Sequence, residues 1–348
     1  MPKNHKFILA GDLGGTNFRI ALFRIVNGPN GTLKKIRSER LSSTRFNSFP
    51  EAVSSFLEKE EVPGNIMTAC FGVPGPNIAG VVHATNLNWL IDVSTLTNVL
   101  GIPRVQILND LEAMAFGVGE LRHSDFLLLQ AGAGSRAGNQ CVIAPGTGLG
   151  EAGLFWDGHR HHPWASEGGH ADFAPTDDVQ AALLEFLHKE YGRVSCERVI
   201  AGIGLNNIYR FLRDTGRGKE KPAIAEKMLV GDVNAIIDEH SRNGSCGLCR
   251  DTMDIFIRIL GAEAGNLALK TMATGGVFLG GGIPPRILEH LRGPLFLESF
   301  LNKGRMRLLL ESMPLSVILN DDAALLGSAR YAARMMSSLR KTIPPKMY

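Results

Sequence analysis

Asp110 is the residue whose type and place in this chain best suit acid–base chemistry. The apolar run Val105–Leu108 is typical of a short buried strand, and the residues after Asp110 read as the start of a helix. A carboxylate at such a junction lies at the sheet edge where ligands bind in open α/β proteins. There it can accept the proton of a bound hydroxyl. The alternative is that Asp110 only caps its helix, since Asn and Asp are preferred caps.

Two glycine-rich turns are suited to binding phosphate. They are Gly11-Asp12-Leu13-Gly14-Gly15-Thr16-Asn17 and Pro145-Gly146-Thr147-Gly148-Leu149-Gly150, and strands are predicted on both sides of each. A dinucleotide fingerprint or a P-loop requires a helix after its glycines, and the first turn also lacks the P-loop lysine. Backbone N–H groups and the Thr16 hydroxyl can still bind phosphate. An ordinary hairpin turn is the alternative, because glycine is common there.

A third polar segment, residues 166–175, carries Glu167 and His170. Their spacing would suit a metal site on a helix, but two glycines between them and Pro175 beyond argue against a helix. We therefore reject zinc here and expect the carboxylate and imidazole to recognise hydroxyl groups. The histidine-rich stretch 158–163 reads as a solvated hairpin loop. The lone pair Cys246 and Cys249 lacks further ligands, so zinc or redox chemistry is not expected of it.

The elements that must position these residues repeat along the chain. The two strand–turn–strand units lie about 130 residues apart, which indicates a duplicated architecture. Ile318-Leu319-Asn320-Asp321 also repeats the Ile107–Asp110 segment. Two facing halves, each with a glycine hairpin, would clamp a polyphosphate between them. We expect Asp110 to carry the chemistry and Asp321 to be a helix cap and hinge residue, because small apolar residues suited to helix packing follow Asp321.

Other segments give more general expectations. Residues 251–272 are predicted to form the longest helix, Ser195 to cap a helix that begins after it, and residues 210–221 to form a charged surface loop. Gly280, Gly281 and Gly282 follow a strand and precede a helix begun by proline. Glycines there let a flat ring lie against the backbone, and close helix–strand packing is the alternative.

Composition limits the class of protein. The chain has 348 residues, which predicts one large or two moderate domains. A net charge of +3 is too weak to argue for nucleic acid or an anionic membrane as partner. No apolar run approaches the length of a membrane span, and the first apolar run is too short for a signal peptide. Five cysteines do not make a disulfide framework, so we expect a cytoplasmic protein.

Taken together, these segments resemble the bacterial glucokinase family of the hexokinase/actin-like ATPase superfamily, over nearly the whole chain. The family's cysteine-rich zinc motif, found in the repressor/open-reading-frame/kinase (ROK) group, is absent, which favours the non-zinc branch. The resemblance implies an α/β fold of the ribonuclease H-like/actin-like type, with a duplicated βββαβα core in two domains and an interdomain cleft. The smaller domain would be residues 1–120 plus 320–348, and the larger one residues 121–319.

The resemblance also implies ATP-dependent phosphorylation of D-glucose on its 6-hydroxyl, with Asp110 as general base. The residues implied to bind the sugar are Asn109, Asp110, Glu167, His170 and Glu197. The residues implied to bind ATP are Gly11, Asp12, Gly14, Gly15, Thr16, Asn17, Gly146, Thr147, Gly280 and Gly281. Asp12 would lie near Mg²⁺, and a homodimer is expected. A kinase for another hexose or amino sugar, and a non-catalytic sugar sensor on the same fold, are the alternatives.

Overall fold

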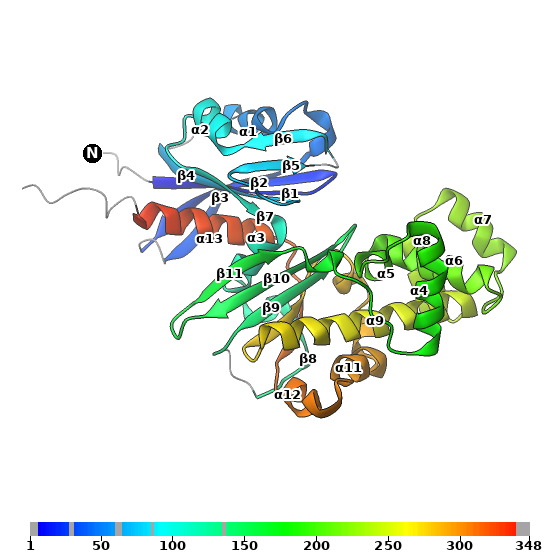
Figure 1. Cartoon of the computed structure of the whole chain (residues 1–348). Coiled ribbons are helices and arrows are strands. Elements are labelled where there is room, and N and C mark those ends of the chain that lie inside the picture. Colours follow the sequence, from blue (N-terminus) through cyan, green and yellow to red (C-terminus); the bar gives the residue numbers. More distant parts are fainter. Residues whose placement is uncertain (1–5, 28–30, 60–64, 85–86, 134–136, 339–348) are drawn as a thin grey trace, which may run out of the picture. The chain divides into compact units, whose positions relative to one another are not determined.

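The structure is a computed structural model, and it describes residues 6–27, 31–59, 65–84, 87–133 and 137–338. Its contacts divide the chain into two units (Figure 1). Unit 1 comprises residues 1–122 and 322–348, and unit 2 comprises residues 123–321. The chain therefore passes between the units twice, after Arg122 and after Asp321. The sequence analysis placed these two crossings after residues 120 and 319.

Unit 1 is built on a five-stranded sheet with the order β3-β2-β1-β4-β7. The strands are β1 (Lys6–Leu13), β2 (Asn17–Val26), β3 (Thr32–Ser42), β4 (Asn65–Val73) and β7 (Val105–Asn109). The first three run antiparallel, and β4 and β7 run parallel to β1. A separate hairpin pairs β5 (Val81–Ala84) with β6 (Trp89–Asp92). The predicted antiparallel meander at the start of the chain is confirmed.

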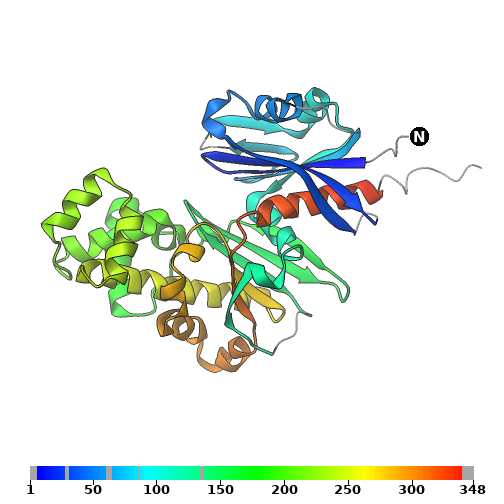
Figure 2. The same ribbon diagram turned by 180° about the vertical axis from the view of Figure 1, so that it is seen from behind.

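Helices cover both faces of this sheet (Figures 1 and 2). One face is covered by α1 (Phe49–Glu58) and α2 (Val93–Leu100), and the other by α3 (Asp110–Val118) and α13 (Ala323–Ser338). Because successive strand residues point to opposite faces, β1 contributes to two cores. Leu9 packs with Phe18, Phe49 and Phe71 on the first face, whereas Ile8 packs with alanines of α13 on the second. A short 3₁₀ turn, Ser43–Arg45, follows β3.

Unit 2 is built on a six-stranded sheet with the order β11-β10-β9-β12-β13-β8. The strands are β8 (Phe126–Gln130), β9 (Gln140–Pro145), β10 (Leu149–Trp156), β11 (His161–Ser166), β12 (Gly276–Leu279) and β13 (Leu315–Ile318). β9, β10 and β11 run antiparallel, and β12 and β13 run parallel to β9. Five strands thus repeat the order and directions of unit 1, and β8 is added antiparallel to β13. The predicted duplication is confirmed.

A series of helices separates β11 from β12 in unit 2. They are α4 (Asp178–Tyr191), α5 (Glu197–Ile200), α6 (Gly202–Asp214), α7 (Pro222–Val230), α8 (Val233–Arg242) and α9 (Gly247–Thr271). α9 is buried along most of its length, and α4 to α8 gather at one of its ends (Figure 2). After β12 come α10 (Leu288–Arg292), α11 (Pro294–Leu301) and α12 (Arg307–Glu311), and α11 packs on α9. The described residues of unit 2 also form 3₁₀ turns at residues 123–125, 168–170, 284–286 and 304–306.

Some helix boundaries differ from those predicted. α9 is the longest helix of the described chain, but it begins at Gly247, because the Sγ of Cys246 accepts a hydrogen bond from the N–H of Cys249 and caps it. The charged stretch 210–221 is not all loop, since α6 continues to Asp214. Ser195 is not a helix cap: α5 begins after Cys196, and the backbone of Ser195 forms an isolated antiparallel β-bridge with Asp172. No helix of the described chain is long and apolar enough to cross a membrane.

Candidate active site

The first glycine turn joins β1 to β2 in unit 1. Gly11 and Asp12 belong to β1 itself, so the turn proper is Gly14-Gly15-Thr16, closed by a 2.8 Å hydrogen bond from Gly14 N–H to Asn17 O. The Nδ2 of Asn17 donates to the Thr16 hydroxyl at 3.0 Å. Asp12 lies opposite Arg19 on β2, and their side chains form an ion pair at 3.6 Å. The turn therefore presents backbone N–H groups, a hydroxyl and one carboxylate.

Asn109 and Asp110 lie at the junction of β7 and α3, as predicted. The structure separates their roles. Asn109 Oδ1 accepts the backbone N–H groups of Leu111 and Glu112 at 2.9 and 3.3 Å, so Asn109 is the N-cap. Asp110 is the first helical residue, and its Oδ1 accepts the Leu111 N–H at 2.9 Å. Asn109 is buried, its Nδ2 donates to Gly75 O at 3.4 Å, and Asp110 is half-buried.

The second glycine turn joins β9 to β10 in unit 2 and packs against the glycine triplet that follows β12. Gly146 N–H donates to Gly148 O at 2.8 Å, which closes the turn. Gly280 N–H donates to Ile143 O and Ile283 N–H to Pro145 O, at 2.8 and 3.1 Å. Gly281 has φ +81°, and a Cβ there would lie 2.5 Å from Pro145 O, so only glycine fits. The backbone after the triplet forms a 3₁₀ turn at Pro284 before α10, in place of the single helix predicted.

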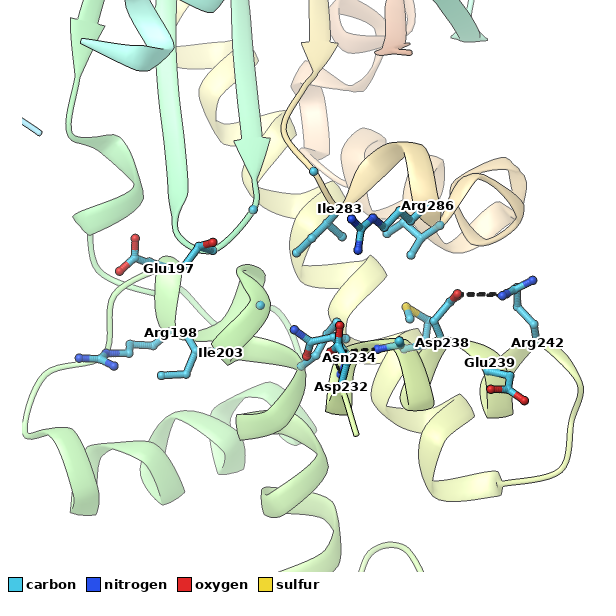
Figure 3. Close-up of a pocket in the computed structure, with 18 residues that line it drawn as sticks. Glu197, Arg198, Ile203, Asp232, Asn234, Asp238, Glu239, Arg242, Ile283 and Arg286 are labelled. Carbon is cyan, nitrogen blue, oxygen red and sulfur yellow. Dashed lines mark hydrogen bonds and ion pairs between the residues drawn. The ribbon is translucent and has the colours of Figure 1, made fainter. Parts of the chain in front are cut away.

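A pocket of about 870 Å³ opens beside this turn, entirely within unit 2 (Figure 3). That volume lies in the range of small-molecule and cofactor sites. Gly146, Thr147 and Glu197 line one end, and the side chains of α8 line the other. At that second end the Nη2 of Arg242 bonds to Asp238 Oδ2 at 3.0 Å, and Arg286 lies nearby (Figure 3). The pocket is thus polar at both ends, with Ile203, Leu205, Ile283 and Ile287 among its apolar lining residues.

The two segments predicted to bind sugar lie together in unit 2. Gly168–His170 forms a 3₁₀ turn, and the segment after it is hydrogen-bonded to the segment before α5. Cys196 N–H donates to Ala171 O at 2.9 Å, and Phe173 N–H donates to Val194 O at 3.0 Å. Glu167 and His170 are exposed, and their side chains lie 3.9 Å apart. They form a pair of polar side chains that a ligand can reach from solvent.

Glu197 connects the sugar-binding segments to the second glycine turn. Its Oε2 accepts the Leu149 N–H at 3.0 Å. A Cβ on Gly148 would lie 2.5 Å from that same oxygen, so the turn approaches the carboxylate closely only because residue 148 is glycine. Glu197 also lines the pocket. One carboxylate therefore contacts the phosphate-type turn and belongs to the predicted sugar site.

Several site residues were missed by the sequence analysis. They are Arg198, Ile203, Asn234, Asp238, Glu239, Arg242 and Arg286, which line the pocket, and Arg19, which pairs with Asp12. The α8 residues lie far from both glycine turns in the sequence and form no motif. Arg19 could have been found from the sequence, because it is an arginine within the otherwise apolar strand that follows the first glycine turn.

The described residues contain no group of three or more His, Cys, Asp or Glu side chains that could hold a metal ion. Mg²⁺ usually keeps several waters and is bound through one or two carboxylates plus substrate phosphates. A single carboxylate, Asp12, beside backbone donors that suit phosphate, fits that mode of binding.

Comparisons with known proteins agree over nearly the whole chain. The glucokinase family model matches residues 9–335. A glucokinase of Trichormus variabilis is 38% identical over 341 residues, covering 94% of this chain and 99% of that protein. A glucokinase of Synechocystis is 34% identical, covering 94% and 98%.

Solved structures have the same fold. The crystal structure of a glucokinase from an Antarctic psychrotroph has a TM-score of 0.81 and 32% identity, covering 94% of this chain and 99% of that one. A ROK family glucokinase from Streptomyces griseus, solved with glucose and AMPPNP, has a TM-score of 0.61 at 18% identity, covering 94% and 99%. The resemblance to the family and the predicted fold class are confirmed: the chain belongs to the glucokinase family and phosphorylates glucose with ATP.

Proposed function

We propose that the γ-phosphoryl group of ATP is transferred to the 6-hydroxyl of D-glucose with Asp110 as the general base. The observation that carries this assignment is the division of roles at the start of α3. Asn109 supplies the N-cap, so capping does not account for a carboxylate at position 110. In phosphoryl transfer a positioned carboxylate accepts the proton of the attacking hydroxyl. Asp110 is the carboxylate that both its position and the family resemblance single out.

The pocket of unit 2 is the proposed site of the nucleoside part of ATP. Its volume, its glycine-lined wall at Gly282 and its apolar lining suit a flat ring. Gly146 and Thr147 at one end would donate to phosphate oxygens, with Gly280 and Gly281 shaping the adjoining backbone. Gly11, Gly14, Gly15, Thr16 and Asn17 in unit 1 would supply further donors. Such fixed donors stabilise the charge that develops on the transferred group.

Glu167, His170, Glu197 and Asn109 are the proposed partners of the remaining sugar hydroxyls. Carboxylates accept charge-assisted hydrogen bonds, which are about twice as strong as neutral ones. A sugar that lacks a hydroxyl leaves such a group unpaired, and this is costly in a desolvated site. Measuring turnover with glucose, its epimers and 2-amino sugars tests whether glucose is the preferred substrate.

The decisive test of the base is Asp110→Ala. We expect glucose binding to persist and turnover to fall by ~10²–10⁴-fold, the usual contribution of a general base. Glucose binding measured by calorimetry and a coupled assay of product formation report the two quantities separately. Near-normal turnover in the folded variant would reject Asp110 as the base.

Mg²⁺ is the proposed metal, held by the phosphates of ATP with Asp12 close by. When bound, it neutralises phosphate charge and orients the transferred group. We expect activity to require added Mg²⁺ and to vanish in EDTA. Elemental analysis of untagged protein should find no tightly bound zinc, since Cys246 and Cys249 do not belong to any group of three or more potential ligands among the described residues. About one zinc per chain would contradict this.

We propose that the enzyme works in the cytoplasm as a homodimer that needs neither nucleic acid nor a membrane. All five cysteines are free, as expected in a reducing compartment. The dimer is implied by the family resemblance alone. Light scattering after size exclusion measures the oligomeric state, and a monomer at micromolar concentration would contradict the proposal.

A further inference from the structure

Two carboxyl groups are buried together beneath the proposed sugar site of unit 2. Glu151 on β10 is 2% exposed and Glu263 on α9 is 6% exposed. In each, Oε1 is buried and makes no hydrogen bond to any described residue. Unsatisfied buried oxygens are rare in folded proteins and require an explanation. Neither residue belongs to the reaction as described above.

The groups around this pair do not neutralise both charges. From α9, Lys270 Nζ lies 3.6 Å from Glu263 Oε1, but Lys270 is largely exposed, and Asn266 Nδ2 donates to Glu263 Oε2 at 2.8 Å. Lys303, after α11, bonds to Asn266 Oδ1 at 2.6 Å and so reaches Glu263 only indirectly. The remaining titratable neighbours are two buried thiols, Cys141 on β9 and Cys196 before α5.

Burial, and then repulsion from Glu263, raise the pKa of Glu151 to about 7. Two neighbouring carboxylates in a desolvated site cannot both ionise at low cost, so one of them keeps a proton. Glu151 therefore keeps its proton up to about neutral pH, and its buried carboxyl group is then neutral.

Glu151 supports the turn that carries Glu167 and His170. Ser166 Oγ donates to Glu151 O at 3.0 Å, and Gly168 N–H donates to that Ser166 hydroxyl at 3.2 Å. A Cβ on Gly168 would lie only 2.0 Å from Glu151 Oε2. The backbone of the turn thus rests directly on the carboxyl group, and any movement of that group is transmitted to the turn.

The pair also lies beside the segment that carries Glu197. Glu263 and Glu151 both raise the pKa of the Cys196 thiol, after the larger effect of burial, so both lie close to it. Cys196 directly precedes Glu197, and its N–H bonds to Ala171 beyond the turn. Glu151 therefore lies close to both proposed sugar-binding segments.

We propose that Glu151 is a positioning residue for glucose: buried and neutral beside Glu263, it holds the Glu167–His170 turn and the start of α5 in the conformation that binds sugar. This inference rests on the proposed assignment of Glu167 and Glu197 as sugar ligands. When Glu151 loses its proton, the ionised group is repelled by Glu263 and needs donors or water that the close packing under Gly168 does not supply. The turn then shifts, and glucose binds less tightly.

The test is the pH dependence of the two KM values. In the unaltered enzyme, the KM for glucose should rise by roughly fivefold to tenfold between pH 7 and pH 8.5, because the loss of one proton is linked to binding. The KM for ATP should stay level. Glu151→Gln, which keeps the shape without the charge, should hold the glucose KM low across this range.

Two further variants sharpen the test. Glu263→Gln removes the repulsion that helps to raise the pKa of Glu151 and that displaces the ionised group, so the rise in glucose KM between pH 7 and pH 8.5 should become smaller. It also serves if Glu151→Gln does not fold. Asp254→Asn is the matched control: it removes another carboxyl of α9 whose pKa burial raises, beside Asp251 and away from the turn. It should keep the unaltered pH profile.

A readout independent of turnover is the rise in melting temperature caused by glucose, measured at pH 6 and pH 8.5. It should shrink at the higher pH in the unaltered enzyme and not in Glu151→Gln. Identical profiles for the two proteins, or an equal rise in the KM for ATP, would overturn the proposal. Glu167→Gln tells the two hypotheses apart, because an unchanged glucose KM in that variant would reject the sugar site itself.

Discussion

Units 1 and 2 share one five-stranded framework and differ in what is attached to it. In both, a hairpin with a glycine turn is followed along the chain by two strands that run parallel to the first strand of the hairpin and lie on its far side in the sheet. Between the third and fourth framework strands, the described residues of unit 1 form the short 3₁₀ turn and α1, whereas those of unit 2 form a 3₁₀ turn and α4 to α9. The pocket and both proposed sugar-binding segments involve that insertion.

The last strands of the two frameworks also end differently. After β7 the chain turns straight into α3, and Asn109 caps that helix. After β13 it continues through Asn320 and Asp321 and leaves the unit before α13 begins at Ala323. The residue directly before α13 is thus Asp322, and not Asp321 as the sequence analysis predicted. The Oδ2 of Asp322 bonds to Lys35 Nζ at 2.5 Å. Two similar tetrapeptides therefore occupy different structural positions.

The largest expected effect compares those two copies. Asp110→Asn should lower turnover by ~10²–10⁴-fold, because an amide cannot accept the proton of the hydroxyl. Asp321→Asn should change turnover only modestly. Turnover and melting temperature of both variants are measured side by side. If Asp321→Asn were inactive with an unchanged melting temperature while Asp110→Asn stayed active, the assignment of the base would have to be reversed.

The next effect concerns the carboxylates of unit 2. Glu197→Gln should raise the KM for glucose by roughly tenfold or more, since a charge-assisted hydrogen bond contributes about 1.5–3 kcal/mol. The KM for ATP should change little, because the amide oxygen of Gln can still accept the Leu149 N–H. Glu167→Gln, at a side chain that lies beside His170, is the control. A weakened ATP site with unchanged glucose binding would show that Glu197 belongs to the nucleotide alone.

A matched pair of glycine substitutions compares the two turns. Gly148→Ala places a Cβ 2.5 Å from Glu197 Oε2, whereas Gly14→Ala meets only the Asn17 carbonyl, at 3.2 Å. Overpacking of the first kind costs about 1–3 kcal/mol and displaces the carboxylate. We expect Gly148→Ala to raise the KM for glucose and Gly14→Ala to leave it near normal. If Gly14→Ala raised the KM for glucose as much as Gly148→Ala does, the two turns would serve the same ligand in the same way.

The pH dependence of stability gives a smaller effect, confined to unit 2. The folded state raises the pKa of Glu151 from 4.5 to about 7, so between these values the folded chain holds a proton that the unfolded chain has released. Stability from this group is therefore full below about pH 4.5 and is lost as the pH rises to about 7, by at most about 3 kcal/mol. Glu151→Gln should lose less stability than the unaltered protein between pH 5 and pH 8 in urea titrations. Parallel curves would contradict the raised pKa.

The smallest effect tests the start of α13. Asp322→Ala should lower the free energy of unfolding by about 0.5–2 kcal/mol, the usual cost of losing a cap. Asp321→Ala, one residue further from the helix, should cost less. Chemical denaturation of the two variants measures both values, and the reverse order would place the cap at Asp321 after all.

Much of this molecule could be predicted because it depends on local sequence. The two hairpins follow from glycines between short apolar runs, and their repetition predicted the duplicated framework. The junction at Asp110 could be located from an apolar run that ends in Asn-Asp. Errors appeared where one residue decides a boundary: a cysteine caps α9, and Ser195 pairs with Asp172 instead of capping α5. Caps depend on the approach of a particular side-chain atom, which local propensity does not fix.

The sequence by itself determined the family, the reaction and the segments that carry polar residues, because those are motifs with fixed local spacing. The tertiary structure alone decided which of them meet. Glu197 touches Leu149, the α8 side chains line the pocket, and Glu151 lies with Glu263 beneath Gly168. These contacts join residues far apart in the chain, and their energies depend on burial and on the loss of water, which no stretch of sequence records. Only the folded chain could show that a buried pair of carboxyl groups supports the turn proposed to bind glucose.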